Sequence, residues 1–283
     1  MTAAQTLAGH TALVTGASRG IGRAIAQRLA AHGAAVVVTA SPRSEPGLRE
    51  TCARIEKAGG RAAWLAADLA DAGAREPLVS RAAECFGPID ILVNNAAAIS
   101  AYAPPSRIDR AARAAMFEVN LQAPIDLIQQ VLPAMRERRW GRILNLSSEM
   151  ARQPPIPYPG PAKMIHALAL YGCAKAALER YTLALAAELH DSGVHVNAVM
   201  PYKIAHTDGA AQVAQAMAST HPDWIEPVEM MAEASYRLIA GDSSGWIAVS
   251  REVLQRAQAK LHALDGVTVL GDALTLDRDI ARN

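Results

Sequence analysis

The stretch Thr11–Gly22 reads TALVTGASRGIG, and it decides the fold. Its first residues form an apolar run typical of a buried strand, and the helix-like stretch Gly22–His32 follows the glycines. Glycines at such a turn let the backbone bend tightly and approach a pyrophosphate, whose charge then lies at the positive end of the helix. The stretch therefore predicts a dinucleotide site, the alternative being a tight strand-to-helix connection that binds nothing.

Apolar runs similar to this first strand recur along the chain, and each is followed by a helix-like stretch. The other runs are Ala35–Thr39, Arg61–Ala66, Ile89–Val93, Arg142–Leu146, Val194–Val199 and Gly245–Val249. The helix-like stretches are Gly22–His32, Pro46–Ala58, Asp71–Phe86, Arg107–Val119, Leu121–Arg138, Tyr171–His190 and Pro227–Ala240. This alternation implies right-handed crossovers and a parallel sheet. We predict a three-layer, Rossmann-like, doubly wound α/β fold in which helices cover both faces of a seven-stranded parallel sheet.

Length and charge narrow the class of protein. A chain of 283 residues suits one α/β domain over 1–283, with a loop insertion around 153–168 and a C-terminal extension at 255–283. Lys and Arg number 28 against 27 Asp and Glu, and this balance argues against a nucleic-acid partner.

Cysteine usage and hydropathy address the compartment. Cys52, Cys85 and Cys173 are too few and too scattered for a disulfide framework, so we expect a reducing, cytoplasmic setting. The stretch MTAAQTLAGH has no Lys or Arg ahead of an apolar run, so we expect no secretory signal. We also expect no membrane span, because no apolar run approaches roughly 18 residues.

The densest chemistry lies in Tyr171-Gly172-Cys173-Ala174-Lys175. A tyrosine and a lysine four residues apart on a helix share a face, so the ammonium group favours the phenolate and lowers the pKa of the phenol. We therefore expect Tyr171 to act as an acid and base, although a YxxxK pair taken alone is more typical of a surface. The eight histidines form no HxxxH or Cys/His cluster, so we expect no metal.

The glycine spacing TGxxxGxG of Thr15–Gly22 resembles that of the classical short-chain dehydrogenase/reductase family. Tyr171 and Lys175 match the family's YxxxK pair, Ser148 matches the serine at the end of its fifth strand, and Asn120 matches its helical asparagine. The resemblance extends over about Thr11 to Val249.

This resemblance implies hydride exchange between a nicotinamide and a carbinol or carbonyl carbon. It implies that Tyr171 moves the proton and that Ser148 orients the substrate oxygen. It further implies that Lys175 tunes Tyr171 and holds the nicotinamide ribose, while Asn120 completes a proton relay. Ser147 is expected to be structural.

Cofactor contacts are also implied by the resemblance. Asp68 would meet the adenine amino group, although a helix N-cap is its alternative role, and Asn94-Asn95-Ala96-Ala97 resembles the family's NNAG. The expected cofactor-contacting residues are Gly16, Ser18, Arg19, Gly20, Ile21, Gly22, Ser41, Arg43, Asp68, Leu69, Asn94, Ala96, Tyr171, Lys175, Pro201, Ile204 and Thr207.

The end of the second strand bears on the choice of nicotinamide cofactor. No acid occurs in Thr39–Arg43, where an acid would bond the ribose 2′-OH. Arg19 and Arg43 carry charge to neutralise a 2′-phosphate, and Ser41 carries a hydroxyl to donate to it. NADP(H) is therefore favoured over NAD(H); the alternative is that Arg43 is a solvated loop charge.

Several segments depart from the family pattern. Ala97 and Tyr202 both stand where the family has glycine. The 22 residues between Ser148 and Tyr171 exceed what the resemblance implies, and the surplus lies in Gln153–Leu168, which we expect to line the substrate pocket.

Two later segments carry further expectations. Asp208–Trp224 is expected to form a helix that covers the substrate. The tail beyond Leu254 is expected to be helical, because Val253, Ala257, Leu261 and Leu264 recur at helical spacing.

The leading hypothesis is an NAD(P)-dependent oxidoreductase that interconverts a small-molecule alcohol and a carbonyl compound, as a homodimer or homotetramer. One alternative is a non-catalytic dinucleotide-binding protein that senses redox state or scaffolds a complex. An epimerase or dehydratase fits the glycine spacing less well. The sequence leaves acyl thioesters, terpenoid alcohols, steroids and small ketones open as substrate classes.

Overall fold

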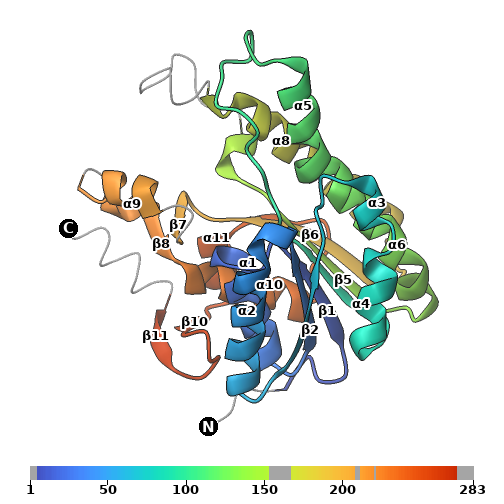
Figure 1. Cartoon of the computed structure of the whole chain (residues 1–283). Coiled ribbons are helices and arrows are strands. Elements are labelled where there is room, and N and C mark those ends of the chain that lie inside the picture. The colour runs from blue at the N-terminus through green and yellow to red at the C-terminus, as the bar shows by residue number, and fades with distance from the viewer. Residues whose placement is uncertain (1–4, 153–166, 208–210, 220, 273–283) are drawn as a thin grey trace.

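A seven-stranded parallel sheet forms the centre of the protein (Figure 1). The computed structural model describes residues 5–152, 167–207, 211–219 and 221–272. The strands lie in the order β3-β2-β1-β4-β5-β6-β9. Their bounds are β1 Thr11–Thr15, β2 Ala35–Ala40, β3 Arg61–Ala66, β4 Ile91–Asn94, β5 Gly141–Leu146, β6 Val194–Met200 and β9 Ile247–Val249. The predicted sheet is confirmed.

Helices cover both faces of this sheet (Figure 1). On one face lie α1 (Gly20–Ala31), α2 (Glu45–Lys57) and α10 (Val228–Ala240). On the other face lie α4 (Leu78–Phe86), α6 (Ala123–Glu137) and α8 (Ala169–Glu188). Successive strand residues point to opposite sides, so Val14 packs in the first core and Leu13 in the second. The predicted three-layer, doubly wound fold is confirmed.

Two predicted helical regions are divided differently in the structure. Asp71–Phe86 divides into α3 (Ala72–Arg75) and α4, because Pro77 between them has no N–H to donate to the helix ladder. The break expected near Asn120 is a π-helical turn, Glu118–Gln122, that joins α5 (Arg110–Phe117) to α6 without interrupting the helical path.

Small elements follow β6 at the carboxyl edge of the sheet. β7 (Ile204–His206) pairs in parallel with β8 (Ile225–Pro227), and α9 (Ala211–Met217) lies between them in the sequence. The sequence predicts a covering helix over Asp208–Trp224. The structure has helix there in α9 and in a 3₁₀ turn, Pro222–Trp224. Residues 208–210 and 220 lie outside the described parts. Most of the predicted insertion, residues 153–166, also lies outside them.

The described part of the C-terminal extension, up to Asp272, ends in a hairpin, and the prediction of a helical tail is wrong from Ala257 to Asp272. Helix α11 (Ser250–Arg256) ends where Gln258 adopts a φ of 46°, which a continuing right-handed helix does not allow. Strands β10 (Lys260–His262) and β11 (Val269–Asp272) then pair antiparallel. The apolar residue Leu261, which suggested a helix by its spacing, is instead buried against the core from a strand and is 1% exposed.

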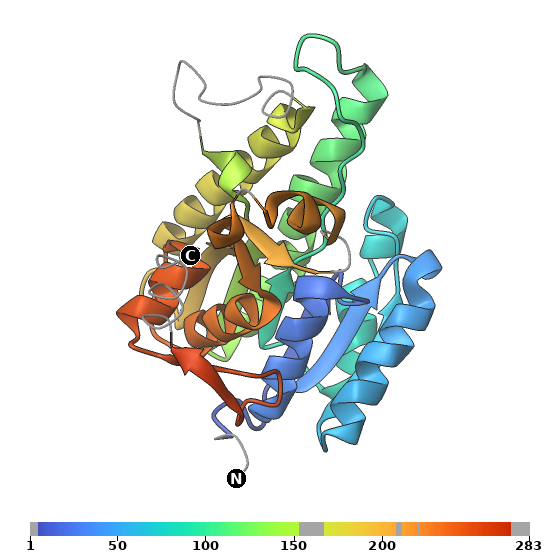
Figure 2. The ribbon, with the colours of Figure 1, turned by 90° about the vertical axis from the view of Figure 1, so that its left-hand side faces the viewer.

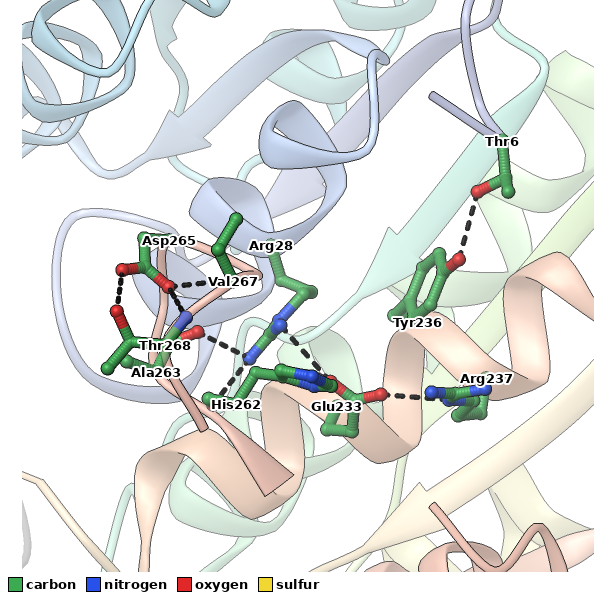
Figure 3. Close-up of polar contacts among 10 residues, drawn as sticks. All are labelled: Thr6, Arg28, Glu233, Tyr236, Arg237, His262, Ala263, Asp265, Val267 and Thr268. Atoms are coloured by element: carbon green, nitrogen blue, oxygen red, sulfur yellow. Dashed lines mark hydrogen bonds and ion pairs between the residues drawn. The ribbon is translucent and has the colours of Figure 1, made fainter. Parts of the chain in front are cut away.

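A buried ion cluster ties this hairpin to α1 and α10 (Figure 3). Arg28 is fully buried, and its Nη1 lies 3.1 Å from Oε2 of Glu233. The other terminal nitrogen of Arg28 donates to the carbonyl oxygens of His262 and Ala263 at 2.7 and 2.8 Å. Arg237 donates to the second oxygen of Glu233 at 2.8 Å. The extension thus packs beside α1 as an integral part of the molecule (Figure 2).

Among the helices in the described parts of the chain, none has the length and apolar character needed to cross a membrane.

Candidate active site

The glycine-rich turn after β1 packs against the loop that follows β4. Gly16 has a φ of +64°, and a Cβ atom there would lie 2.8 Å from the Cα of Ala96. The side-chain amide of Asn95 donates to the carbonyl oxygens of Thr15 and Gly16 at 2.8 and 3.1 Å. Only glycine fits this position. No side chain therefore covers the backbone of the turn before α1. Asn95 was not among the predicted site residues, although its place in the Asn94-Asn95 pair was a signal for it.

The turn leads directly into the N-terminus of α1, where free backbone N–H groups favour an anion. Arg19 precedes this helix and is exposed, whereas Ser18 is buried. Thr207 lies across the turn, because a Cβ atom on Gly20 would be 3.4 Å from the Cβ of Thr207. The segment that follows β6 thus reaches the glycine-rich turn at Thr207.

The predicted adenosine side of the site lies at the carboxyl ends of β2 and β3. Ser41 and Arg43 belong to the 3₁₀ turn region after β2, with Arg43 exposed and the Ser41 hydroxyl 3.4 Å from that of Ser44. Asp68 is exposed and accepts a hydrogen bond from the Ala70 N–H at 3.0 Å, while Leu69 is buried. These residues line the same sheet edge as the glycine-rich turn.

Asn94 is buried within the sheet. Its side-chain amide donates to the Asn145 side-chain oxygen at 2.9 Å, and the Asn145 amide donates to the Thr182 hydroxyl at 2.9 Å. This chain connects β4, β5 and α8. It keeps β4, β5 and the middle part of α8 in a fixed relation.

Ser148 and Tyr171 come together through a close approach of two backbones. Ser148 follows β5 and accepts a hydrogen bond from the Met150 N–H at 3.2 Å, which caps the 3₁₀ turn Glu149–Ala151. A Cβ atom on Gly172 would lie 2.2 Å from the Met150 carbonyl oxygen, so only glycine allows this turn to pack on α8. Burial raises the pKa of Tyr171 to about 12, and a hydrogen bond with Ser148 acts in the opposite direction.

Lys175 lies one helical turn beyond Tyr171 and is 1% exposed. Its amine donates to the Leu146 carbonyl oxygen at 2.7 Å and lies 5.7 Å from the centre of the Tyr171 ring. Burial lowers the pKa of Lys175 to about 8. The sequence predicted the proximity of the pair, but the expected lowering of the Tyr171 pKa is absent, because burial of the phenol outweighs its neighbours.

Asn120 occupies the centre of the π-helical turn and is fully buried. Its amide donates to the carbonyl oxygens of Met116 and Ala98 at 2.8 and 2.7 Å. The wider turn frees the Met116 carbonyl for this bond, which ties α5 to the loop after β4. The structure therefore places Asn120 beside the loop that also packs on the glycine-rich turn.

Arg75 is a further residue that sequence reasoning missed. It is 3% exposed, donates to the Leu69 carbonyl oxygen at 2.6 Å and pairs with Glu118 and Asp126 at 2.6 and 2.7 Å. It thereby links the loop after β3 to the π-helical turn. Nothing in the local sequence pairs an arginine with carboxylates more than 40 positions away.

Comparison with known proteins gives a family for this arrangement. The family model described as short chain dehydrogenase matches residues 10–218. The chain belongs to the short-chain dehydrogenase/reductase family. The glycine-rich turn and the Ser148, Tyr171 and Lys175 cluster lie within the residues that this family model matches.

Members of this family with similar sequences include two curated proteins. The chain is 37% identical over 220 residues to the short chain dehydrogenase MYCFIDRAFT_6125 of Pseudocercospora fijiensis, covering 76% of this chain and 66% of that protein. It is 36% identical over 202 residues to the ketoacyl reductase HetN of a Nostoc species, covering 71% of this chain and 66% of that protein. In both cases the match spans just under two thirds of the relative's length.

A solved structure in the short-chain dehydrogenase/reductase family agrees with the fold. A 3-oxoacyl (acyl-carrier-protein) reductase from Agrobacterium tumefaciens, with NADP bound, superposes with a TM-score of 0.73 at 32% identity, covering 86% of this chain and 93% of that one. The chain therefore belongs to a family of oxidoreductases, of which this solved member has NADP bound.

Proposed function

We propose that the protein interconverts an alcohol and a ketone or aldehyde with NADP(H), and that Ser148, Tyr171, Lys175 and Asn120 form its active site. The observation that carries the proposal is the assembly around Tyr171. Its phenol is hydrogen-bonded to Ser148, and the buried amine of Lys175 lies under its ring. A half-buried tyrosine beside a buried lysine at the carboxyl edge of a parallel sheet is typical of a catalytic site.

The residues have distinct roles in the proposed mechanism. A nicotinamide held at the glycine-rich turn would supply or accept the hydride. In reduction the protonated phenol of Tyr171 gives its proton to the carbonyl oxygen, and in oxidation the phenolate form of Tyr171 takes the hydroxyl proton. Ser148 donates a hydrogen bond to that oxygen and stabilises its developing charge. Lys175 stabilises the phenolate of Tyr171 when the proton leaves, and Asn120 fixes the loop after β4 beside them.

The glycine-rich turn fits a dinucleotide. A side chain at Gly16 would fill the space against Ala96, and the adjoining N-terminus of α1 offers unpaired N–H groups to a pyrophosphate. Exposed Arg19 and Arg43 at the ends of β1 and β2 favour a 2′-phosphate, and the Agrobacterium reductase has NADP bound. We therefore propose NADP(H) in preference to NAD(H).

The setting of the enzyme is also part of the proposal. Three free cysteines fit a reducing, cytoplasmic compartment. The small polar face of α8 supports a homodimer or homotetramer built on this helix.

Replacing the phenol tests the mechanism. Tyr171→Phe removes the only transferable proton of that ring, so turnover of carbonyl substrates should fall by about 10²- to 10⁴-fold. NADPH affinity should stay within about twofold, because the phenyl ring keeps the packing. The measurements are NADPH absorbance during turnover and NADPH fluorescence during binding.

A matched control lies on the same helix. Tyr181→Phe removes a hydroxyl from α8 away from Ser148, and it should leave both turnover and NADPH binding unchanged. Full activity of Tyr171→Phe would refute the catalytic assignment. Tight NADPH binding with no turnover of any carbonyl or alcohol by the unmodified protein would favour the non-catalytic alternative.

A further inference from the structure

An ion pair joins the two loops that flank the proposed reacting side chains. Glu149 directly follows Ser148 after β5, and Lys203 lies in the segment between β6 and β7. The amine of Lys203 contacts the carboxylate of Glu149, and the two side chains are 26% and 31% exposed. The pair therefore spans the carboxyl edge of the sheet beside Ser148. We call Glu149 and Lys203 the entrance bridge.

Two aromatic rings lie next to the Lys203 amine of the entrance bridge. The amine of Lys203 lies 5.7 Å from the centre of the Tyr202 ring and 5.6 Å from that of Trp224. Both distances allow a cation–π attraction, which restricts Lys203 to the position from which it reaches Glu149. Tyr202 stands where the family resemblance leads one to expect glycine, so this bulk is a property of the present chain.

Residues from the C-terminal part of the chain contact Tyr202, the neighbour of Lys203 in the entrance bridge. Glu226 of β8 is fully buried and accepts a hydrogen bond from the Tyr202 backbone and one from the Ser250 hydroxyl, whose oxygen lies 2.7 and 2.9 Å from the two carboxylate oxygens. The guanidinium of Arg251 lies 4.2 Å from the centre of the Tyr202 ring and donates to the Asp223 carbonyl oxygen at 2.9 Å. The Tyr202-Lys203 segment is therefore fixed through its backbone, its ring and its amine.

Fixing the segment in this way has a steric consequence. A partly exposed ion pair stabilises a fold only weakly, so the pair matters chiefly through the space that it occupies. We propose that the entrance bridge of Glu149 and Lys203 closes one side of the substrate entrance and selects unbranched carbonyl and alcohol substrates over branched ones. This inference rests on the proposed function, because it takes Ser148 and Tyr171 to mark the reacting carbon.

Turnover of paired ketones tests the filter. Straight-chain methyl ketones are compared with methyl ketones of equal carbon number that carry a tert-butyl or cyclohexyl group, with NADPH as reductant. Lys203→Ala and Glu149→Ala should each raise the branched-to-straight ratio of kcat/KM by about tenfold. The double variant should raise it no further, because either change opens the same contact. Lys203→Arg keeps the ion pair and should keep the original ratio.

The controls separate a filter from a general effect of charge. Arg136→Ala and Glu188→Ala break an exposed ion pair far from the site and should leave the ratio unchanged. An unchanged ratio in Lys203→Ala and Glu149→Ala, with the unmodified enzyme active, would overturn the filter and leave the proposed function intact.

Binding gives a readout that needs no turnover. The ketones are titrated into the complex of NADPH with Tyr171→Phe, and the quenching of NADPH fluorescence reports their affinity. Adding Lys203→Ala to this variant should raise the relative affinity for the branched ketones by about tenfold. No change there would overturn the filter, whereas absence of turnover in the unmodified protein would count against the proposed function alone.

Discussion

At the scale of single residues, Arg43 is the side chain on which the proposed choice of cofactor depends most directly. It is exposed in the turn after β2, where an acid would instead bond a ribose 2′-OH. Its neighbour Ser41 adds a hydroxyl, and Arg19 is exposed at the glycine-rich turn. An exposed guanidinium is well suited to bind a phosphate.

Arg43→Ala should therefore weaken NADPH binding by about tenfold and leave NADH binding within about twofold, because only NADPH carries the 2′-phosphate. Fluorescence titration with each cofactor measures both constants. Arg54→Ala, which breaks an exposed pair with Glu50 further along α2, is the matched control. Equal losses for both cofactors would contradict the assignment of Arg43.

At the scale of elements, the contact between β8 and α11 depends on a buried acid. Glu226 accepts from the Ser250 hydroxyl, and Arg251 lies 3.6 Å from it, yet burial raises the pKa of Glu226 to about 7. The folded protein thus keeps this proton at pH values where the unfolded chain has lost it. Stability from Glu226 is fully present below about pH 4.5 and is lost as the pH rises through 7.

Glu226→Gln should flatten this dependence, because glutamine accepts the same hydrogen bond and does not ionise. Between pH 5 and pH 8 the unmodified protein should lose on the order of 2 kcal/mol more stability than the variant. Thermal denaturation at the two pH values measures the difference. Glu252→Gln, at an exposed position of α11, should keep the original profile. Parallel profiles for Glu226→Gln and the unmodified protein would count against a buried, protonated Glu226.

At the scale of the whole molecule, the ion cluster around Arg28 joins the first helix to the last hairpin. Arg28 and Glu233 are 0% and 1% exposed, so removing Glu233 leaves the buried guanidinium without its carboxylate, and removing Arg28 leaves the buried carboxylate with Arg237 as its remaining arginine partner. The hairpin carbonyls of His262 and Ala263 would lose their donor as well. The extension therefore depends on α1 and α10 for its position.

Arg28→Ala should lower the free energy of unfolding by about 3–5 kcal/mol and expose the hairpin to proteolysis first. The double variant Arg28→Met with Glu233→Leu should recover most of this loss, because it removes both charges together. Arg49→Ala, which breaks an exposed pair with Glu45, should cost less than about 1 kcal/mol. Denaturant unfolding with limited proteolysis measures these effects. A loss for Arg28→Ala no larger than that for Arg49→Ala would show that the cluster does not hold the hairpin.

The sheet, its helices and the positions of Tyr171, Lys175 and Ser148 were predictable from the sequence alone. Strand runs, helical spacing and the glycine-rich turn are local patterns, because a strand or a helix buries its own apolar side chains at a fixed period. The hairpin after Arg256 was not predictable. Its apolar spacing fits a helix as well as a buried strand, and the left-handed Gln258 decides between them.

Contacts between residues far apart in the chain could not be predicted from local sequence patterns. The entrance bridge, the links of Arg75 to Glu118 and the Arg28 cluster each join segments at least 40 positions apart. The pKa of Tyr171 belongs with them, because burial by surrounding segments sets it. Local periodicity and motif spacing in the sequence were thus enough to predict the fold and the type of chemistry. The tertiary structure decided which charges are buried and what flanks the site, since desolvation and long-range pairing exist only once the chain has folded.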